Sequence, residues 1–472
     1  MKNLFILFLL LFCVKTYAQE VFIAKPYLQI GHNPSPESLQ LLWHSADDNS
    51  VWTVEIQANK NAAWIKTLPT TAVKIAVQGI TPHKVYHASF TSLKTGSTFN
   101  YRVLRDGKEV FMSEAKAPIA ADKPYRFVAF ADIGAETVVQ KRLATQVYAN
   151  NPDFVVIPGD IVYDRGLISE YRTKFWPIYN ADKSDSSGSP IMRKIPMISA
   201  AGNHDLDTRD LDKFPDALSY FYYWNQPLNG LVGVEGGPIV PTLTASATNR
   251  AAFQEAAGDA YLKMANYSFD YGNAHWLVLD SNPYVDFTDK TLQDWVKNDL
   301  ANAKDATWKF VMYHHPGFNS AREHYEQQHT RLLSPIFEAN NVDVVFNGHV
   351  HNYQRTFPLK FVPDKKGVLL VGGMGNKTVR GRVVNGSWKL DKDFDGKTNT
   401  KPNGIIYLIT GAGGNDLYNP EQQKDPDSWQ KFTDKFISEV HSITVADVDD
   451  KTMTIKQLDV DGKVLDSFKV TK

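Results

Sequence analysis

Two different patterns of apolar and polar residues divide this chain into two regions. Between residues 19 and 118, the segments SLQLLWHS (38–45), VWTVEIQA (51–58) and VYHASFTSL (85–93) alternate apolar with polar residues. A fourth segment, TFNYRVLRDGKEVFMS (98–113), contains RDGKE, a hairpin turn of the Asp-Gly kind. Alternation at this spacing predicts a small all-β sandwich of the immunoglobulin or fibronectin type over residues 19–118.

After a connector, APIAADKP (117–124), the pattern changes to continuous apolar runs that each end in a polar cluster. The helical spacing of Val138, Leu143 and Val147 between the first two runs predicts a strand–helix–strand unit. Continuous apolar strands indicate a sheet covered on both faces. We therefore expect a second domain of the α/β class over residues 119–472. The runs are RFVAFADIG, DFVVIPGD, IPMISAAGNHD, HWLVLDS, KFVMYHHP and VDVVFNGHVH.

Two later segments have their own patterns. The tail from Ile443 to the end alternates as strands around a second Asp-Gly turn, and we assign it to the outer sheet of the second domain. The aromatic run YFYYW at 220–224 predicts a packed cluster, with a substrate-facing loop as the alternative.

Composition narrows the class of protein. The chain has 472 residues, which suits two domains, and its 43% hydrophobic content is typical of a globular protein. A formal net charge of −1 gives no electrostatic case for a nucleic-acid or anionic-membrane partner.

The first 18 residues resemble an export signal. Lys2 precedes an apolar stretch over 4–14, and Thr16-Tyr17-Ala18 places a small residue before a cleavage site at Gln19. This predicts a secreted or periplasmic protein without disulfides, because the single cysteine, Cys13, lies inside the signal. An uncleaved anchor is the alternative, but the apolar run is shorter than the ~20 residues needed to span a bilayer.

Candidate metal ligands stand where the apolar runs end. A single such residue is more typical of a turn, a helix cap or a packed side chain, and His275, inside a run, is interpreted as structural. Five run ends that all carry such residues are hard to explain without a function, because carboxyl ends of strands meet at one edge of a sheet. The residues are Asp132, Asp160, Tyr163, Asn203, His204, Asp205, His314, His315, His349 and His351.

The residue types favour two metal ions rather than one. There are more ligands than one tetrahedral ion takes, and mixed oxygen and nitrogen donors suit two unlike ions about 3.5–4 Å apart. In an extended backbone, His349 and His351 face the same way roughly 6.6 Å apart, so each could reach one ion of a pair. The spacing also allows both histidines to bind one ion.

These residues fall into five ordered blocks, and with them the chain resembles the purple acid phosphatases of the calcineurin-like metallophosphoesterases. The tyrosine in the second block is the specific feature, and the preceding β region resembles the fibronectin-type-III-like domain of the plant-type members. The resemblance implies a four-layer αββα sandwich for the second domain. The blocks are Asp132-Ile133-Gly134, Gly159-Asp160-Ile161-Val162-Tyr163, Gly202-Asn203-His204-Asp205, Val311-Met312-Tyr313-His314 and Gly348-His349-Val350-His351.

The resemblance also implies roles. Asp132, Tyr163 and His351 would hold a ferric ion. A divalent ion, such as Zn, Mn or Fe(II), would be held by Asn203, His314 and His349, with Asp160 bridging the two metals. His204 and, on a looser match in NSAREHYE, His324 would contact the phosphate or assist the leaving group, and Asn203 would also touch the substrate. His315 stands where plant relatives often carry a small polar residue.

The implied activity is that of an acid phosphatase, which hydrolyses small phosphate monoesters by in-line attack of a metal-bound hydroxide without a phosphoenzyme. A phosphodiesterase or nucleotidase with the same metal pair is one alternative, and a non-catalytic extracellular binding protein is another. The natural substrate, the divalent metal and the oligomeric state stay open.

Three further motifs give weaker signals. DKDFDGKTN (391–399) begins like a calcium loop but has proline at its closing position, which favours a solvated turn. Glycosylation acceptor patterns occur at Asn266, Asn376 and Asn385. GAGGND (411–416) lacks dinucleotide-binding spacing and predicts a tight turn near the site.

Overall fold

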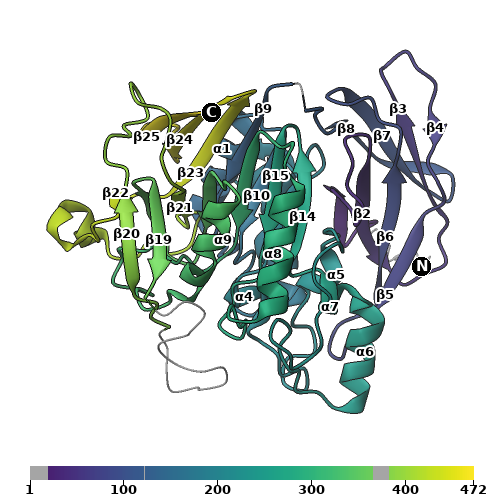
Figure 1. Cartoon of the computed structure of the whole chain (residues 1–472). Coiled ribbons are helices and arrows are strands. Elements are labelled where there is room, and N and C mark those ends of the chain that lie inside the picture. Colours follow the sequence, from purple (N-terminus) through teal and green to yellow (C-terminus); the bar gives the residue numbers. More distant parts are fainter. Residues whose placement is uncertain (1–19, 122, 365–381) are drawn as a thin grey trace, which may run out of the picture.

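Two stacks of β-sheet, one all-β and one flanked by helices, make up the structure (Figure 1). The structure is a computed structural model that describes residues 20–121, 123–364 and 382–472. The predicted export signal, with Cys13, and the acceptor pattern at Asn376 lie outside the described residues, and both stay predictions. The limits of 118 and 119 predicted for the two domains also stay predictions.

The N-terminal unit is the expected all-β sandwich. Its sheets have the orders β1-β2-β6-β5 and β4-β3-β7-β8, and all their pairings are antiparallel. Inward-facing aromatic side chains fill the space between the sheets, where Trp43 stacks on Tyr86 with ring centroids 5.4 Å apart. The strands are β1 (Ala24–Gln29), β2 (Leu39–Ala46), β3 (Trp52–Gln57), β4 (Ile65–Lys66), β5 (Thr71–Ile75), β6 (His83–Phe90), β7 (Thr98–Arg105) and β8 (Lys108–Lys116).

The predicted Asp-Gly hairpin joins β7 to β8. Asp106 and Gly107 have φ of 51° and 78°, the left-handed conformation that a two-residue turn of this kind requires. The sequence patterns located β2, β3, β6, β7 and β8, but they missed β1, β4 and β5. β4 and β5 are mostly exposed and β1 is mostly buried, so none of the three alternates along its length.

The second unit contains two large sheets, ordered β13-β10-β9-β23-β24-β25 and β14-β15-β16-β17-β21-β18-β22. The strands that carry the apolar runs, β9, β10 and β13 in one sheet and β15, β16, β17 and β21 in the other, are parallel within each sheet. The strands are β9 (Tyr125–Ala129), β10 (Phe154–Pro158), β13 (Met197–Ala200), β14 (Tyr267–Tyr271), β15 (Ala274–Val278), β16 (Trp308–Met312), β17 (Val344–Asn347), β18 (Tyr353–Thr356), β21 (Ile406–Thr410), β22 (Thr433–Ile437), β23 (Ser442–Asp449), β24 (Thr452–Asp459) and β25 (Val464–Thr471).

Large aromatic side chains pack the two sheets face to face. Phe127 of β9 contacts Trp276 of β15 and Phe346 of β17, with ring centroids 5.1 Å and 5.7 Å apart. Helices cover the outer faces, since α1 packs on β23 and α8 on β15 (Figure 1). The predicted fold class, a layered α/β sandwich behind an all-β sandwich, is therefore confirmed.

Among the described residues, α1, α6 and α8 are the longer helices, and the others are short. They are α1 (Val138–Ala149), α2 (Ile168–Glu170), α3 (Trp176–Tyr179), α4 (Asn203–Leu206), α5 (Tyr220–Tyr223), α6 (Ala247–Ala257), α7 (Ala260–Lys263), α8 (Lys290–Asn302) and α9 (Ser334–Ala339), with a π-helical turn at Tyr171–Phe175 and 3₁₀ turns at His329–Leu333, Pro420–Lys424 and Pro426–Ser428. Two small hairpins pair β11 (Asn180–Asp185) with β12 (Gly188–Pro190) and β19 (Leu359–Pro363) with β20 (Gly386–Leu390).

Helix α1 forms where the strand–helix–strand pattern predicts it, but its apolar face differs from the prediction. Val138 is the first helical residue and is 73% exposed, whereas Gln140 is buried with Leu143 and Val147. Gln140 tolerates burial because its amide donates to the carbonyl of Lys174 and its oxygen accepts from the N–H of Glu136.

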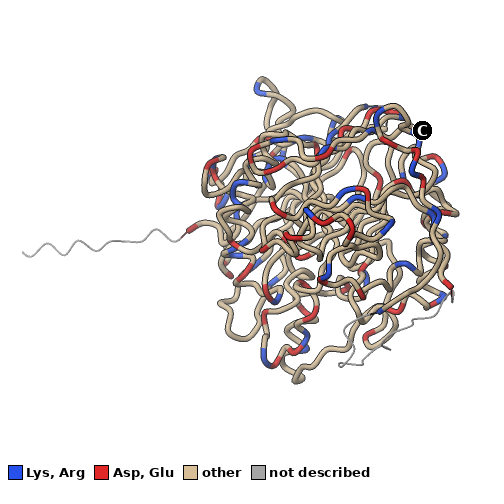
Figure 2. Tube along the Cα trace, turned by 90° about the vertical axis from the view of Figure 1, so that its left-hand side faces the viewer, with Lys and Arg blue, Asp and Glu red and all other residues tan. Residues whose placement is uncertain are grey.

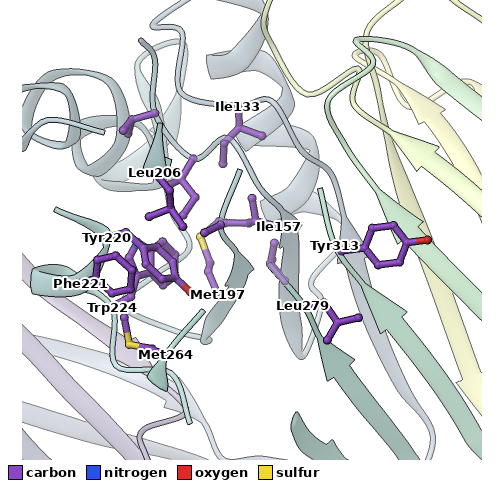
Figure 3. Close-up of a cluster of buried hydrophobic side chains, with 14 of the residues drawn as sticks. Ile133, Ile157, Met197, Leu206, Tyr220, Phe221, Trp224, Met264, Leu279 and Tyr313 are labelled. Carbon is purple, nitrogen blue, oxygen red and sulfur yellow. The ribbon is translucent and has the colours of Figure 1, made fainter. Parts of the chain in front are cut away.

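The aromatic run of α5 packs as a cluster, as the sequence analysis favoured. Tyr220, Phe221 and Trp224 lie beside Met197 beneath the first sheet (Figure 3). Tyr223 reaches further and stacks on His44 of the N-terminal sandwich, with ring centroids 4.5 Å apart. The cluster therefore joins the two units.

Buried histidines of the sandwich line this contact. His44 bonds the hydroxyl of Tyr27, and His83 bonds the hydroxyl of Tyr223, at 2.9 Å in each case. Burial, together with the nearby Arg172 guanidinium, lowers the pKa of His83 to about 4, and burial lowers the pKa of His44 well below 6.5. Both rings are neutral at pH 7.

The C-terminal strands join the first sheet through β23, which pairs antiparallel with β9. The tail thus lies in a sheet of the second domain, as expected, and its predicted turn places Gly462 at φ 81°. Arg355 of β18, 4% exposed, donates to Asp466 of β25 at 2.7 Å and pairs with Asp434 at 2.7 Å, and Tyr353 also donates to Asp466. This buried network joins β25, the last strand, to β18, which follows His349-Val350-His351 in the chain.

Charges show no segregation along the trace. Basic and acidic residues alternate over the face that Figure 2 shows, in keeping with the small net charge. Among the described residues, no helix combines the length and apolar character that a membrane crossing requires.

We expect Asp466→Asn to lower the free energy of unfolding by about 3 kcal/mol, because it leaves a buried guanidinium with one carboxylate instead of two. Urea denaturation measures the change. Asp461→Asn is the matched control, since Asp461 is 74% exposed in its pair with Arg142 and should change stability little. Equal effects of the two substitutions would contradict a role for the buried network.

The buried histidines predict a loss of stability in mild acid. The pKa of His83 is lower in the folded protein than in the unfolded chain, so its contribution is complete above pH 6.5 and declines as the pH falls towards 4. For one such group the loss between pH 7 and pH 5 is about 2 kcal/mol. Denaturation of His83→Gln at both pH values should show a smaller difference than the wild type; an unchanged difference would disprove this assignment.

Candidate metal centre

The site forms where the carboxyl ends of both large sheets meet. Asp132 and Asp160 follow β9 and β10 of one sheet, whereas His314 and His349 follow β16 and β17 of the other. Asn203 opens helix α4 directly after β13. The face-to-face packing of the sheets therefore brings oxygen donors from one sheet to nitrogen donors from the other.

The carboxylate of Asp160 lies at the centre of the group. Its Oδ2 atom accepts from the hydroxyl of Tyr163 at 3.1 Å and lies 3.1 Å from Nε2 of His314. Its Oδ1 atom accepts from the backbone N–H of His204 at 2.9 Å. Ligand atoms of Asp160, His314 and His349 all lie within 4.8 Å of one another, close enough to hold one ion.

A second group surrounds the hydroxyl of Tyr163. It donates to Oδ1 of Asp132 at 2.9 Å and lies 3.2 Å from Nε2 of His351. The same nitrogen of His351 lies 3.4 Å from Asp132. Because the hydroxyl of Tyr163 contacts both Asp132 and Asp160, the group around Asp160 and the group around Tyr163 adjoin each other.

Backbone carbonyls orient two of the imidazoles. Nδ1 of His314 bonds the carbonyl of Pro158 at 2.8 Å, and Nδ1 of His351 bonds the carbonyl of Asp416 at 2.6 Å. A carbonyl can only accept, so each Nδ1 carries a proton and each Nε2 is the ring atom that faces the site. The Nε2 atom of His314 also lies 3.2 Å from Oδ1 of Asn203.

The chain adopts left-handed backbone conformations at three of these residues. Asp132, Asp160 and His349 have φ of 61°, 52° and 68°. Such values are uncommon outside glycine and cost on the order of 1–3 kcal/mol each, so the surrounding packing must hold them. Strain of this kind is typical of a site whose side chains are aimed at a ligand.

Glycines leave room for the ligand side chains. A Cβ atom on Gly202 would lie 2.1 Å from Oδ1 of Asp160, and one on Gly411 would lie 2.7 Å from Oδ2 of Asp132. Gly348 is equally restricted, with 2.9 Å to the same Asp132 oxygen. The start of the GAGGND segment therefore lies beside the site, as predicted.

The two candidate substrate-side histidines flank the group. His204 bonds the carbonyl of Asp164 through Nδ1 at 2.8 Å, its Nε2 atom lies 4.0 Å from Asp160, and its side chain is 33% exposed. The ring of His324 lies 3.9 Å from that of His349. The nine residues to which the resemblance gives a role thus lie together, including His324, whose match is the loosest.

The electrostatics of the site suit cations. Burial and the carboxylates of Asp132 and Asp160 raise the pKa of Tyr163 well above 10. Burial by itself would lower the pKa of His314, but the adjacent Asp160 raises it to about 9. Nε2 of His349 is buried and has no partner among the described residues. Two carboxylates, a phenol and an unpaired imidazole nitrogen are the donor set that metal ions would satisfy.

Supporting residues that were not predicted from the sequence follow β15. Asn282 donates to the carbonyl of Gly202 at 3.2 Å and to Asp280 at 2.9 Å, and Ser281 bonds His315. The run HWLVLDS ends in Asp280 like the other runs, so its end was a usable signal. Asp205 was included for its block alone; its carboxylate accepts from the N–H groups of Gly202 and Ile161, and burial raises its pKa to about 8.

Other sequence motifs lie away from the site. His275 of β15 bonds Asp270 of β14 and Asp299 of α8 at 2.8 Å each, a structural arrangement as interpreted. In the calcium-like loop, Asp395 accepts from three following backbone N–H groups, which is a capped turn. Asn266 is 3% exposed and accepts from the N–H of Asp280, so its acceptor pattern is not available to a glycosyltransferase.

Comparisons with known proteins agree with this geometry. The family model for calcineurin-like phosphoesterases matches residues 125–353. Purple acid phosphatase 22 of Arabidopsis thaliana is 26% identical over 58% of this chain and 54% of its own length. Purple acid phosphatase 1 of Ipomoea batatas is 25% identical over 66% of this chain and 60% of its own length. Residues 125–353 therefore form a calcineurin-like phosphoesterase domain, and the chain as a whole is similar to the purple acid phosphatases.

Solved structures share the fold. The purple acid phosphatase PPD1 from yellow lupin seeds superimposes with a TM-score of 0.62 at 16% identity, covering 94% of this chain and 74% of that one. PhoD superimposes with a TM-score of 0.58 at 12% identity, covering 97% and 91%. This chain spans 54% to 62% of the length of the first three curated relatives. The matched residues 125–353 include every candidate metal ligand, from Asp132 to His351.

We expect Gly411→Ala to reduce the metal content of the purified protein and its phosphoesterase activity at least about 10-fold, because the added Cβ displaces Asp132 or the carbonyl of Val350. Elemental analysis measures the metal. Gly79→Ala is the control, since a Cβ there meets nothing within 4 Å and only its φ of 81° is strained. Normal metal content in Gly411→Ala would contradict this account of the glycine.

Proposed function

We propose that this protein is a binuclear metal-dependent acid phosphatase that hydrolyses small phosphate monoesters. The observation that supports the proposal best is the convergence of seven oxygen and nitrogen donors on Asp160 and Tyr163. They come from both sheets and from positions 132 to 351 of the chain. Packing needs alone do not account for so many buried titratable groups at one place.

The donors divide into two sets by their contacts. Asp132, Tyr163 and His351 contact one another and would hold a ferric ion, which prefers carboxylate and phenolate oxygens. Asn203, His314 and His349 form the other set, which would hold a divalent ion such as Zn, Mn or Fe(II). Asp160 contacts both sets and would bridge the ions. When bound, the metal pair would supply an activated water and neutralise the phosphate oxygens.

His204 is suited to serve the departing group. Its Nδ1 is fixed by the carbonyl of Asp164, so its Nε2 is the free position and faces the site beside Asp160. Partial exposure leaves that nitrogen accessible to a substrate. On the opposite side, His324 lies over His349, and either imidazole could hold a proton for the leaving oxygen.

Metal analysis combined with a panel of phosphate esters tests the proposal. The wild type should contain iron and a divalent metal and should cleave p-nitrophenyl phosphate faster than bis(p-nitrophenyl) phosphate. Asp160→Asn should lose metal and lower kcat/KM at least about 1000-fold, as expected when the bridging charge is removed. Asp461→Asn, on the surface, controls for the same chemical change.

Colour tests the ferric set independently. A tyrosinate bound to ferric iron absorbs visible light, so Tyr163→Phe should lose the band while iron is still detected. An iron-loaded wild type without colour would disprove the ferric assignment. Faster cleavage of the diester would favour the phosphodiesterase alternative, and metal without any hydrolysis would favour a binding protein.

A further inference from the structure

His315 is a buried side chain at the site that the proposed chemistry does not use. It follows His314 directly and is 1% exposed. Its backbone N–H donates to Oγ of Ser281 at 2.8 Å, and its Nδ1 lies 3.1 Å from the same oxygen. Ser281 therefore fixes both the backbone and the ring of His315.

The ring of His315 lies against the ring of His349. The two centroids are 4.2 Å apart at an interplanar angle of 45°. On another side of His349, the ring of His324 lies 3.9 Å away at 39°. His349 thus has one imidazole neighbour that is deeply buried and one that is partly exposed.

His349 differs from the other two histidine ligand candidates in how its ring is held. Carbonyls of Pro158 and Asp416 hold the rings of His314 and His351. Among the residues that the structure describes, no hydrogen bond holds the ring of His349, and its Nε2 has no partner. Its backbone is left-handed, with φ of 68°, and its N–H donates to Asp132. Ring packing is what remains to set the orientation of this imidazole.

We propose that His315, fixed by Ser281, is a positioning residue that holds the His349 imidazole towards Asp160 and His314 by ring contact. The proposal rests on the ligand assignment in the proposed function, which gives His349 to the divalent ion. Groups that support metal ligands typically change metal affinity by about 10–100-fold. Without the buried ring, the imidazole of His349 can turn away from its ligand neighbours.

The effect should be confined to one of the two ions. His351 and Tyr163 are held by Asp416 and Asp132, and neither contact includes His315. Loss of His315 therefore leaves the ferric set in place. The expected signature is weaker binding of the divalent ion with an unchanged visible band.

Equilibrium dialysis of iron-loaded protein against Zn²⁺ tests this, with the visible band recorded on the same samples. We expect His315→Ala to weaken Zn²⁺ binding at least about 10-fold and to keep the band. His315→Phe retains a ring and should stay within about 3-fold of the wild type. Ser281→Ala should fall between the two, because it frees the ring without removing it.

A buried histidine elsewhere separates metal affinity from general stability. His275→Ala removes the bridge from Asp270 of β14 to Asp299 of α8, so it should destabilise the fold without changing Zn²⁺ affinity. Wild-type affinity in His315→Ala would overturn the proposal. Equal losses in His315→Ala and His315→Phe would also overturn it, as would loss of Zn²⁺ and the band together. A wild type that binds no second metal ion would instead disprove the proposed function.

Discussion

The contact between the two large sheets is the constraint on which the site depends. Each sheet carries only part of the donor set, aspartates on one and histidines on the other. Phe127, Trp276 and Phe346 interdigitate between them and fix their separation. Because interiors pack densely and transmit displacements, a shift of one sheet would separate Asp160 from His314.

Within that frame, the polypeptide accepts local strain so that the ligands converge. Three candidate ligands have left-handed backbones, and glycines at 202, 348 and 411 leave space where any side chain would strike a carboxylate. Side-chain supports from outside the motifs, such as Asn282 below Gly202, hold the turns. The left-handed backbones, the glycines and the supporting hydrogen bonds hold the donor side chains in place without a metal. The side chains would therefore need little rearrangement when a metal binds.

The N-terminal sandwich contacts the second unit through side chains as well as through the connecting segment. Its histidines hydrogen-bond tyrosines that lie across the contact or beside it, and the aromatic run of α5 contacts the sandwich on one side and the first sheet on the other. The sandwich therefore buttresses the helices beneath β10 and β13, whose ends carry Asp160 and Asn203. An interface built on neutral imidazoles makes the cohesion of the two units sensitive to acid.

The sequence by itself determined the elements and the chemistry of the site. Alternation and continuous runs identified most strands, Asp-Gly pairs identified two turns, and the run ends identified the side chains that gather at the candidate site, because periodicity and turn chemistry are local properties. Tertiary structure alone decided which strands form which sheet, that Val138 faces solvent while Gln140 is buried, and that Asn266 is inaccessible. It also decided how the rings of His315 and His349 meet, because contacts between segments distant in the chain depend on packing that no local pattern encodes.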